Sequence, residues 1–327
     1  MSAAGDHPEP VLITGAGGFV GRHAIAALQV AFPHAEIIGT SSTGGEFRLL
    51  DVTDRAAVRA LVAEVRPASC LHLAAVSAIG AARADPGLAW SVNLHGTLHL
   101  AEAIRDLAPA CRLVHVSSAE VYGGSFRAGR ALAEDALPAP MNIYAATKAA
   151  ADLALGAMAA DGLRVVRLRP FNHTGPGQGT AFVVAAFAWQ IAQIEAGRAE
   201  PRIATGALDP ERDFLDVRDI CAAYAAALAR FDALPNGAII NLASGTPRRI
   251  GAVLEELLEL SGVKAAPVTD PARLRPADIP RACGDAGRAA SLLGWKPSIP
   301  WSRTLSDVLQ DCRARVAAGE SLKFHTF

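Results

Sequence analysis

A tyrosine and a lysine four residues apart, Tyr144 and Lys148, form the pair in this sequence best suited to acid–base chemistry. They stand at the head of an alanine-rich run that predicts a helix, and residues four apart on a helix share one face. A free tyrosine loses its proton at about pH 10, and a neighbouring cation favours the phenolate and lowers that pKa. The pair can therefore exchange a proton at a carbonyl or an alcohol. The spacing alone favours the alternative, a surface helix whose lysine packs along the tyrosine ring.

A glycine-rich turn near the N-terminus places this pair in a chemical context. The apolar run 11–13 predicts a buried strand, and 22–30 predicts a helix. Between them, Gly15 permits a tight turn, Gly18 lets the backbone approach a pyrophosphate, and Gly21 lets the helix pack on the strand. A strand, a glycine turn and a helix together hold phosphate at a helix N-terminus. The alternative is a glycine-rich surface turn.

The end of the next predicted strand, 35–39, bears on the choice between NAD and NADP. An NAD-specific site usually has an acid here, on the ribose 2′-hydroxyl. This chain has the hydroxyl run 40–43 instead, and Arg48 is the only cation nearby in the sequence. Hydroxyls tolerate a 2′-phosphate that a carboxylate would repel, so we expect NADP(H) to be preferred, with NAD(H) as the alternative. Equally, these residues can merely cap a turn.

The rest of the first half alternates between strands and helices. Strands are predicted at 70–75, 112–116 and 163–169, and helices at 54–65, 90–107 and 145–160. This order predicts an α/β fold: a Rossmann-type doubly wound parallel sheet with a smaller mixed α/β C-terminal substrate domain. We expect an NAD(P)-binding domain over 1–169, to which 213–243 returns, and a substrate domain over 170–327. Ligands of such sheets bind beyond the carboxyl ends of the strands.

Composition excludes several classes of partner. The 327 residues are 51% hydrophobic and carry a net charge of −1, so no bulk attraction to nucleic acid or acidic membranes is expected. No apolar stretch reaches the length of a membrane helix, and 1–10 lacks the apolar core of a secretory signal. The five cysteines and nine histidines show no metal-ligand spacing, so we expect no metal site. Reduced thiols and a cytoplasmic location are expected.

The glycine turn, the Ser118 loop and the Tyr144/Lys148 pair, in this order, resemble the extended short-chain dehydrogenases/reductases, which act mostly on nucleotide sugars. The resemblance spans essentially the whole chain. It implies that Tyr144 is the acid/base, that Lys148 lowers its pKa and holds the nicotinamide ribose, and that Ser118 hydrogen-bonds the reacting oxygen. It also implies a homodimer, formed by two helices of each subunit in a four-helix bundle, to which the alanine-rich run 145–160 is suited.

The motifs and the resemblance together imply a cofactor site and a substrate site. The expected cofactor-binding residues are Gly15, Gly18, Phe19, Val20, Gly21, Thr40, Ser41, Asp51, Val52, Leu73, Ala74, Ala75, Asn93, Tyr144, Lys148 and Phe171. The expected substrate-binding residues are Ser77, Asn172, Phe182, Val183, Arg212, Arg275 and Asp278. Arginine forks pair phosphate, so Arg212 and Arg275 suit the diphosphate of a nucleotide sugar, and Asp278 suits a ribose hydroxyl. The alternative for Arg212 is an ion pair with an acid beside it in the sequence.

One position bears on the reaction. Within the family, the block 172–278 most resembles enzymes that act on GDP-mannose derivatives. One class of these enzymes is the 4,6-dehydratases, and another class reduces the 4-keto-6-deoxy sugar. The resemblance implies that dehydratases carry Asp or Ser as the proton donor between a Ser/Thr and a Glu, whereas here Ala119 lies between Ser118 and Glu120. General acid–base catalysis is worth about 10²–10⁴-fold, so the missing acid disfavours elimination.

We therefore expect NAD(P)H-dependent reduction of the C4 keto group of a nucleotide-linked 4-keto-6-deoxy sugar, GDP-4-keto-6-deoxy-D-mannose to GDP-D-rhamnose. Tyr144, Lys148 and Ser118 suffice for that reaction. Glu120 either positions a sugar hydroxyl or is a solvated carboxylate at the edge of the loop. A GDP-mannose 4,6-dehydratase, a nucleotide-sugar 4-epimerase and a dinucleotide-binding sensor without activity are the alternatives.

Overall fold

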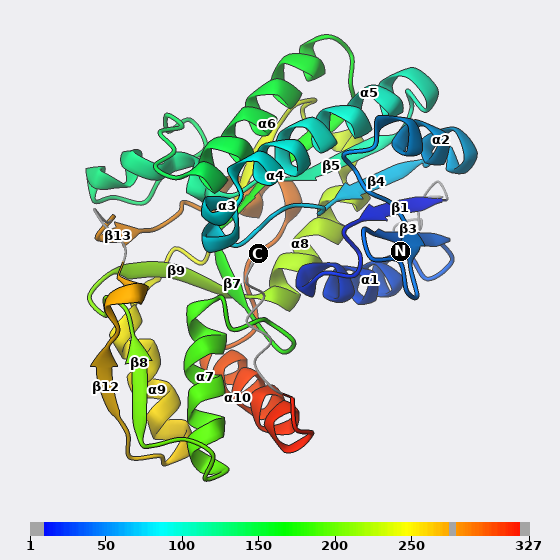
Figure 1. Cartoon of the computed structure of the whole chain (residues 1–327). Coiled ribbons are helices and arrows are strands. Elements are labelled where there is room, and N and C mark those ends of the chain that lie inside the picture. Colours follow the sequence, from blue (N-terminus) through cyan, green and yellow to red (C-terminus); the bar gives the residue numbers. More distant parts are fainter. Residues whose placement is uncertain (1–9, 275–278, 321–327) are drawn as a thin grey trace, which may run out of the picture.

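The computed structural model describes residues 10–274 and 279–320. Its largest element is a parallel seven-stranded sheet with the order β10-β6-β5-β4-β1-β2-β3 (Figure 1). The strands are β1 (Val11–Thr14), β2 (Ile37–Ser41), β3 (Arg48–Leu49), β4 (Ser69–His72), β5 (Arg112–Val116), β6 (Val165–Pro170) and β10 (Ile239–Leu242). The predicted doubly wound parallel sheet is confirmed, and the strand order changes direction between β1 and β4, where such folds bind dinucleotides.

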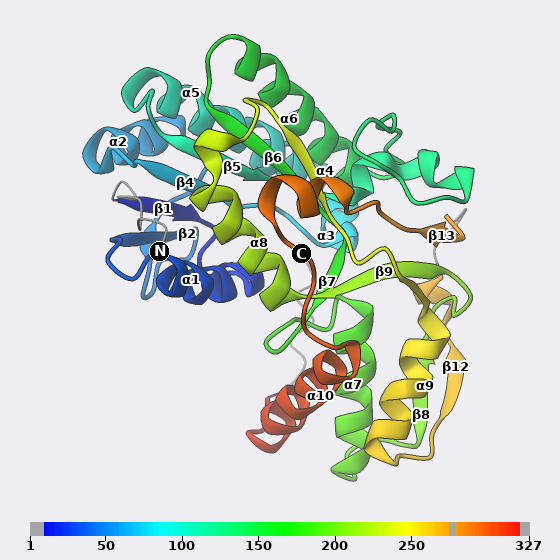
Figure 2. The same cartoon turned by 180° about the vertical axis from the view of Figure 1, so that it is seen from behind.

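Helices cover both faces of this sheet. One face carries α2 (Arg55–Val65), α5 (Thr97–Leu107) and α6 (Ile143–Ala160), and the other carries α1 (Phe19–Ala31) and α8 (Val217–Ala229) (Figures 1 and 2). Because both faces are covered, β1 is buried along its whole length, and Leu12 and Ile13 have no exposed surface.

The segment predicted as one helix over 90–107 is interrupted. It is preceded by α3 (Ile79–Ala84) and α4 (Pro86–Trp90), and a π-helical turn (Ser91–Gly96) joins α4 to α5. Gly96 packs so closely that a Cβ there would lie 2.6 Å from the Cγ2 of Val52. π-Helical turns are frequent at functional sites, and this one carries Asn93.

A smaller unit lies beyond the carboxyl edge of the main sheet. Its centre is β9 (Glu211–Asp216), which pairs with β7 (Asn172–Thr174), β11 (Pro247–Arg249) and β13 (Arg281–Ala282), while β8 (Arg202–Thr205) pairs with β12 (Ala266–Thr269). The helices α7 (Val183–Glu195), α9 (Ile250–Ser261) and α10 (Trp301–Ala317) enclose a separate hydrophobic core. Short helical turns lie at Ala119–Ala128 (η2), Phe231–Ala233, Pro271–Arg273 and Ala289–Leu293.

The segment 213–243 is shared between the two units. Its α8 and β10 lie against the main sheet, where β10 pairs with β6, whereas its first residues complete β9 in the smaller unit. The division into two domains at residue 169 stays a prediction.

Candidate active site

Helix α6 carries the Tyr144/Lys148 pair across the carboxyl end of β5. The helix begins at Ile143 because Asn142 caps it, accepting a hydrogen bond of 2.8 Å from the amide of Ala145. One turn after Tyr144, the ammonium of Lys148 donates to the carbonyl oxygen of Val116 at 2.6 Å, and Lys148 is only 3% exposed. The cap and this bond fix how the helix sits on the sheet.

Ser118 lies directly after β5 and faces the phenol. Its Oγ accepts from the amide of Glu120 at 3.1 Å, which fixes its rotamer and leaves its own proton free to donate. A hydrogen bond from Ser118 reaches the phenol of Tyr144. Ser118, Tyr144 and Lys148 are thus brought together from β5 and α6. Glu120, on the same loop, receives a long hydrogen bond of 3.4 Å from the side chain of Asn142.

The ionisation of Tyr144 differs from the prediction. Burial raises the pKa of Tyr144 to about 12, although the hydrogen bond from Ser118 lowers it, and the negative charge of Glu120 raises it further. The resemblance implies that Lys148 lowers this pKa, but its ammonium is bonded to Val116, and removal of the phenol from water dominates. At neutral pH, Tyr144 is therefore a protonated phenol, which suits a proton donor.

Lys148 is shifted in the opposite direction. Burial lowers the pKa of Lys148 to about 8, while the carboxylate of Asp152 raises it. The group is thus charged at neutral pH but close to losing its proton.

We expect Lys148→Met to abolish catalysis yet stabilise the fold at neutral pH. The folded lysine releases its proton at about 8 and the unfolded one at 10.5, so between these values the unfolded state binds more protons and the free energy of unfolding rises with pH. Below this window the buried ammonium destabilises the fold by about 3 kcal/mol. Urea unfolding at neutral pH and above pH 10.5 measures the effect. A variant less stable than the wild type at neutral pH would contradict the expectation.

The glycine turn is shaped for close contact with a dinucleotide. Gly15 has φ +74°, and a Cβ there would lie 2.7 Å from the amide nitrogen of Ala74. A Cβ on Gly21 would collide with the carbonyl oxygens of Gly15 and Ala16. Helix α1 begins at Phe19, directly after Gly18. Its first turn contains no acid, and no side chain among the residues that the structure describes caps it. Its first amides, which include Val20, are thereby open to an anion, so these residues fit a pyrophosphate.

The end of β2 differs from the expectation. The strand runs to Ser41, so Thr40 is buried and its hydroxyl donates to the carbonyl of Ile13 at 3.3 Å instead of facing the cleft. Ser41 forms the turn considered as the alternative, with its Oγ 3.2 Å from the amide of Thr43. Ser41 remains beside the glycine turn, because a Cβ on Gly17 would lie 2.9 Å from its Oγ.

The cation beside this loop is one that the sequence argument missed. Arg48 is paired with Glu64 on α2 at 2.7 Å. Arg22, in contrast, reaches the same loop from α1: it pairs with Glu46 at 2.7 Å and lies 5.7 Å from the centre of the Phe47 ring. Its position directly after Gly21 is the signal that could have found it.

The expected contacts on the far side of the glycine turn fall into two groups. Asp51 is exposed and accepts from the amide and hydroxyl of Thr53, and the backbone 73–75 lies half-buried against the glycine turn. Val52 is buried under Gly96, and Asn93 is fully buried. The Asn93 amide group donates to the carbonyl of Val76 at 3.1 Å and to Thr147 at 2.9 Å, so it holds the loop after β4 against α6. Val52 and Asn93 are thus buried residues that hold the backbone around the site in place.

Phe171 does not lie in the cleft. Its ring is 2% exposed, packs edge-on against Phe126, and occupies the space above Gly284, where a Cβ would lie 2.5 Å away. The expectation that it binds the cofactor is wrong for its side chain, because Phe171, between β6 and β7, is part of the hydrophobic core.

The expected substrate residues come from both units. Ser77 and Asn172 are exposed, and Asn172 pairs with Phe214 of β9. Phe182 is 37% exposed and precedes Val183, the first residue of α7. The guanidinium of Arg212 donates to the carbonyls of Glu211 and Ile279, both at 2.9 Å. Arg275 and Asp278 lie outside the described residues.

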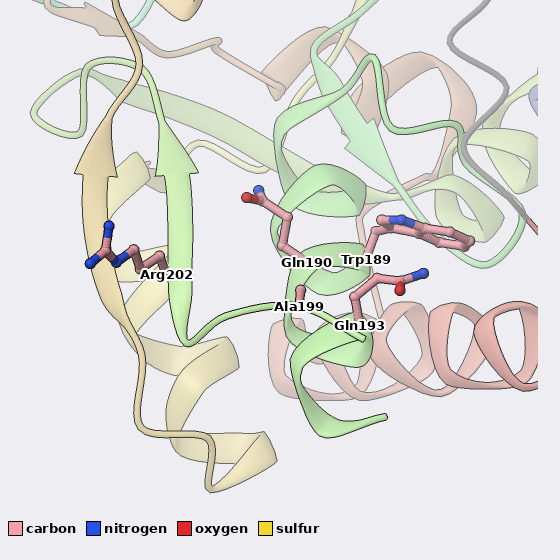
Figure 3. A pocket seen from close by; sticks show the side chains of 5 residues that line it. All are labelled: Trp189, Gln190, Gln193, Ala199 and Arg202. Carbon is pink, nitrogen blue, oxygen red and sulfur yellow. The ribbon is translucent and has the colours of Figure 1, made fainter. Parts of the chain in front are cut away.

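A cavity of about 350 Å³ lies elsewhere, against α7. It is lined by Trp189, Gln190, Gln193, Ala199 and Arg202, and Figure 3 shows the arginine directed away from the helix. No expected site residue lines it. Among the described residues no group of side chains could hold a metal ion, and no helix of that part of the chain could cross a membrane.

Comparisons with known proteins find relatives that match nearly the whole chain. GDP-6-deoxy-D-mannose reductase of Pseudomonas aeruginosa is 35% identical over 307 residues, which are 94% of this chain and 98% of that protein. The structure of RMD from Pseudomonas aeruginosa complexed with NADPH superposes with a TM-score of 0.82 at 32% identity, covering 94% of this chain and all of that one. The UDP-glucose 4-epimerase of Thermus thermophilus in complex with NAD gives a TM-score of 0.80 at 28% identity, covering 93% and 98%.

A family model also matches residues 11–243, a range that includes the glycine turn, Ser118, Tyr144 and Lys148. The resemblance inferred from the motifs is therefore confirmed. The chain belongs to the NAD dependent epimerase/dehydratase family.

Proposed function

We propose that this chain is an NAD(P)H-dependent oxidoreductase that reduces the C4 keto group of GDP-4-keto-6-deoxy-D-mannose to give GDP-D-rhamnose. The observation that carries the choice of reaction is Ala119, which is 6% exposed and has no polar side-chain atom between Ser118 and Glu120. The similarity to GDP-6-deoxy-D-mannose reductase over nearly the whole chain supports the choice of substrate.

The side chains suit reduction. With the keto oxygen between Ser118 and Tyr144, the serine hydroxyl would turn from the phenol to the substrate, and both hydroxyls would then donate to the atom that gains charge. A nicotinamide held by the glycine turn and by Lys148 would supply the hydride to C4. As the alkoxide forms, Tyr144 donates its proton, for which its raised pKa keeps it protonated. NADP(H) is preferred in this proposal, and Arg22 and Ser41 would hold its 2′-phosphate.

Two incubations test this reaction against the dehydratase alternative. The protein with GDP-mannose alone is expected to form no keto sugar. When a 4,6-dehydratase of known activity supplies the keto sugar, NADPH absorbance is expected to fall with time. A keto product from GDP-mannose alone would assign the chain to the dehydratases, and unchanged absorbance with the keto sugar would favour a sensor without activity.

We also propose a cytoplasmic homodimer. Helix α6 presents outward a surface that includes Leu153, which is 57% exposed, and small residues such as Ala157 that allow close helix packing. All five cysteines are buried free thiols, which suits a reducing compartment. Light scattering at micromolar concentration is expected to give the mass of a dimer, and Leu153→Glu that of a monomer. A wild-type protein that is a monomer would contradict the proposed dimer through a four-helix bundle.

A further inference from the structure

Helix α6 carries a third ionisable side chain on the face of Tyr144 and Lys148. Asp152 follows Lys148 by four residues, one helical turn, and it is 1% exposed. The mechanism proposed above does not use it. A carboxylate so deeply buried needs partners, because an unpaired buried charge is strongly unfavourable.

Two arginines from β6 clamp this carboxylate. Arg169 forms a two-pronged bond, from Nε to Oδ2 at 2.9 Å and from its terminal nitrogen to Oδ1 at 3.0 Å. Arg167 donates to Oδ1 at 3.1 Å and also to the Asp152 carbonyl at 2.9 Å. Such forks fix geometry as well as charge. Burial raises the pKa of Asp152, yet the bonds and charge of Arg169 outweigh it and hold that pKa below its usual value.

The clamped Asp152 carboxylate affects the ionisation of Lys148. From β5 and β4, the neighbouring His115 and His72 are both buried, and burial lowers the pKa of His72 to about 3 and that of His115 well below 6.5, so both rings are neutral. Neither histidine therefore carries a charge that could stabilise the Lys148 ammonium. Of the residues that the structure describes, Asp152 is the one whose charge favours the buried ammonium of Lys148.

We propose that Asp152 is a positioning residue for the proposed reaction: clamped by Arg167 and Arg169, its carboxylate keeps the buried Lys148 ammonium charged and available to the nicotinamide ribose. The use made of Lys148 rests on the proposed function. The electrostatic link between Asp152 and Lys148 is inferred from their positions one turn apart on the buried face of α6 and from the direction in which Asp152 shifts the pKa of Lys148. This link can be measured without any substrate.

Lysine-labelled NMR measures that link directly. The sequence has four lysines, Lys148, Lys264, Lys296 and Lys323, so ¹³C,¹⁵N-lysine labelling gives few signals, and Lys148→Met assigns the one of interest. In the wild type we expect Lys148 to titrate at about 8. Asp152→Asn should move its titration down by about one pH unit. Arg167→Gln should move the Lys148 titration to higher pH, because the Asp152 carboxylate is then less neutralised. This variant keeps the Arg169 fork, so it serves as the test if Asp152→Asn does not fold.

Asp219→Asn is the matched control. Asp219 is also buried, at 4% exposed, and accepts from Ser298 at 2.9 Å, but it lies on α8 across the sheet. This variant should lose stability and leave the Lys148 titration unchanged. A Lys148 titration that stays at the wild-type pH in Asp152→Asn, or in Arg167→Gln should the first not fold, overturns the proposal.

Kinetics separate this inference from the proposed function. If the chain reduces the keto sugar, the alkaline limb of its kcat profile should follow the Lys148 titration in each variant. A merely structural Asp152 would instead lower activity equally at every pH. If the wild type reduces no keto sugar while the NMR shifts occur as expected, the proposed function fails and the electrostatic link remains.

Discussion

Replacing Tyr144 by phenylalanine is expected to lower the rate of carbonyl reduction by about 10²–10⁴-fold, with a much smaller effect on NADPH binding. The substitution removes one oxygen from a half-buried ring and keeps the helix cap and the Lys148 bond to Val116. The lost group is the proton donor placed beside Ser118. The measurement is single-turnover oxidation of bound NADPH by the keto sugar, together with an NADPH titration by fluorescence.

The chain offers a matched control for this variant. Tyr224 is also buried, and its hydroxyl has no hydrogen-bond partner among the described residues. Tyr224→Phe should therefore retain the wild-type rate. Tyr122→Phe should retain it too, and lose about 1 kcal/mol of unfolding free energy, because Tyr122 donates to Asn241 at 2.7 Å. A Tyr144→Phe rate within about tenfold of the wild type would mean that another group gives the proton.

Replacing Gly15 by alanine is expected to weaken NADPH binding by at least about 100-fold, or ~2.7 kcal/mol. Two effects combine. At φ +74°, alanine is strained by about 1–2 kcal/mol, and its Cβ would lie 2.7 Å from the backbone nitrogen of Ala74. The glycine turn must then move away from the end of β4, which opens the cradle that the pyrophosphate needs.

Gly262, at the end of α9, separates these two effects. It has a similar φ of +71°, but a Cβ there would meet nothing within 4 Å. Gly262→Ala should therefore show the backbone strain alone, seen as a small loss of stability with nearly wild-type NADPH affinity. Calorimetric titration with NADPH and urea unfolding measure both variants. Equal affinities for the two would show that the close approach at Gly15 does not shape the cofactor site.

The parts of the fold that can be predicted are those with strong local signals. The glycine turn, the apolar strands and the alanine-rich run after Tyr144 each have a pattern that persists whatever packs around it. For this reason the sequence predicts β5 at its observed bounds, 112–116, and it places Tyr144 at the head of a helix, which begins at Ile143. The order of these elements then predicts the parallel sheet, since strands alternating with helices form one.

The end of β2 cannot be predicted from a local pattern. The sequence predicts this strand over 35–39, whereas it runs over Ile37–Ser41, because β1 pairs with it as far as Thr40. A shift of two residues keeps the alternation of side chains but extends the strand into the hydroxyl run. Thr40 is therefore part of the sheet, and the nearby cation is Arg22 from a different element.

Burial decides the remaining differences. The resemblance assigns Phe171 to the cofactor, but tertiary packing places its ring against Phe126. Helical spacing predicts that Tyr144 and Lys148 share a face, yet the direction of their pKa shifts depends on how many atoms surround them. Desolvation dominates both, raising the pKa of Tyr144 and lowering that of Lys148. No local pattern indicates the role of Asp152, because its partners, Arg167 and Arg169, lie on a strand that follows it in the sequence.

The most direct test of the proposed reaction identifies its product. GDP-mannose, a 4,6-dehydratase of known activity, this protein and NADPH are incubated together, and the product sugar is examined by NMR. The site built from Ser118, Tyr144 and Lys148 predicts GDP-D-rhamnose, with one NADPH oxidised for each sugar reduced, and with product forming about 10²–10⁴-fold more slowly when Tyr144→Phe replaces the wild type. An unreduced 4-keto sugar in the presence of wild-type protein and NADPH would contradict the account.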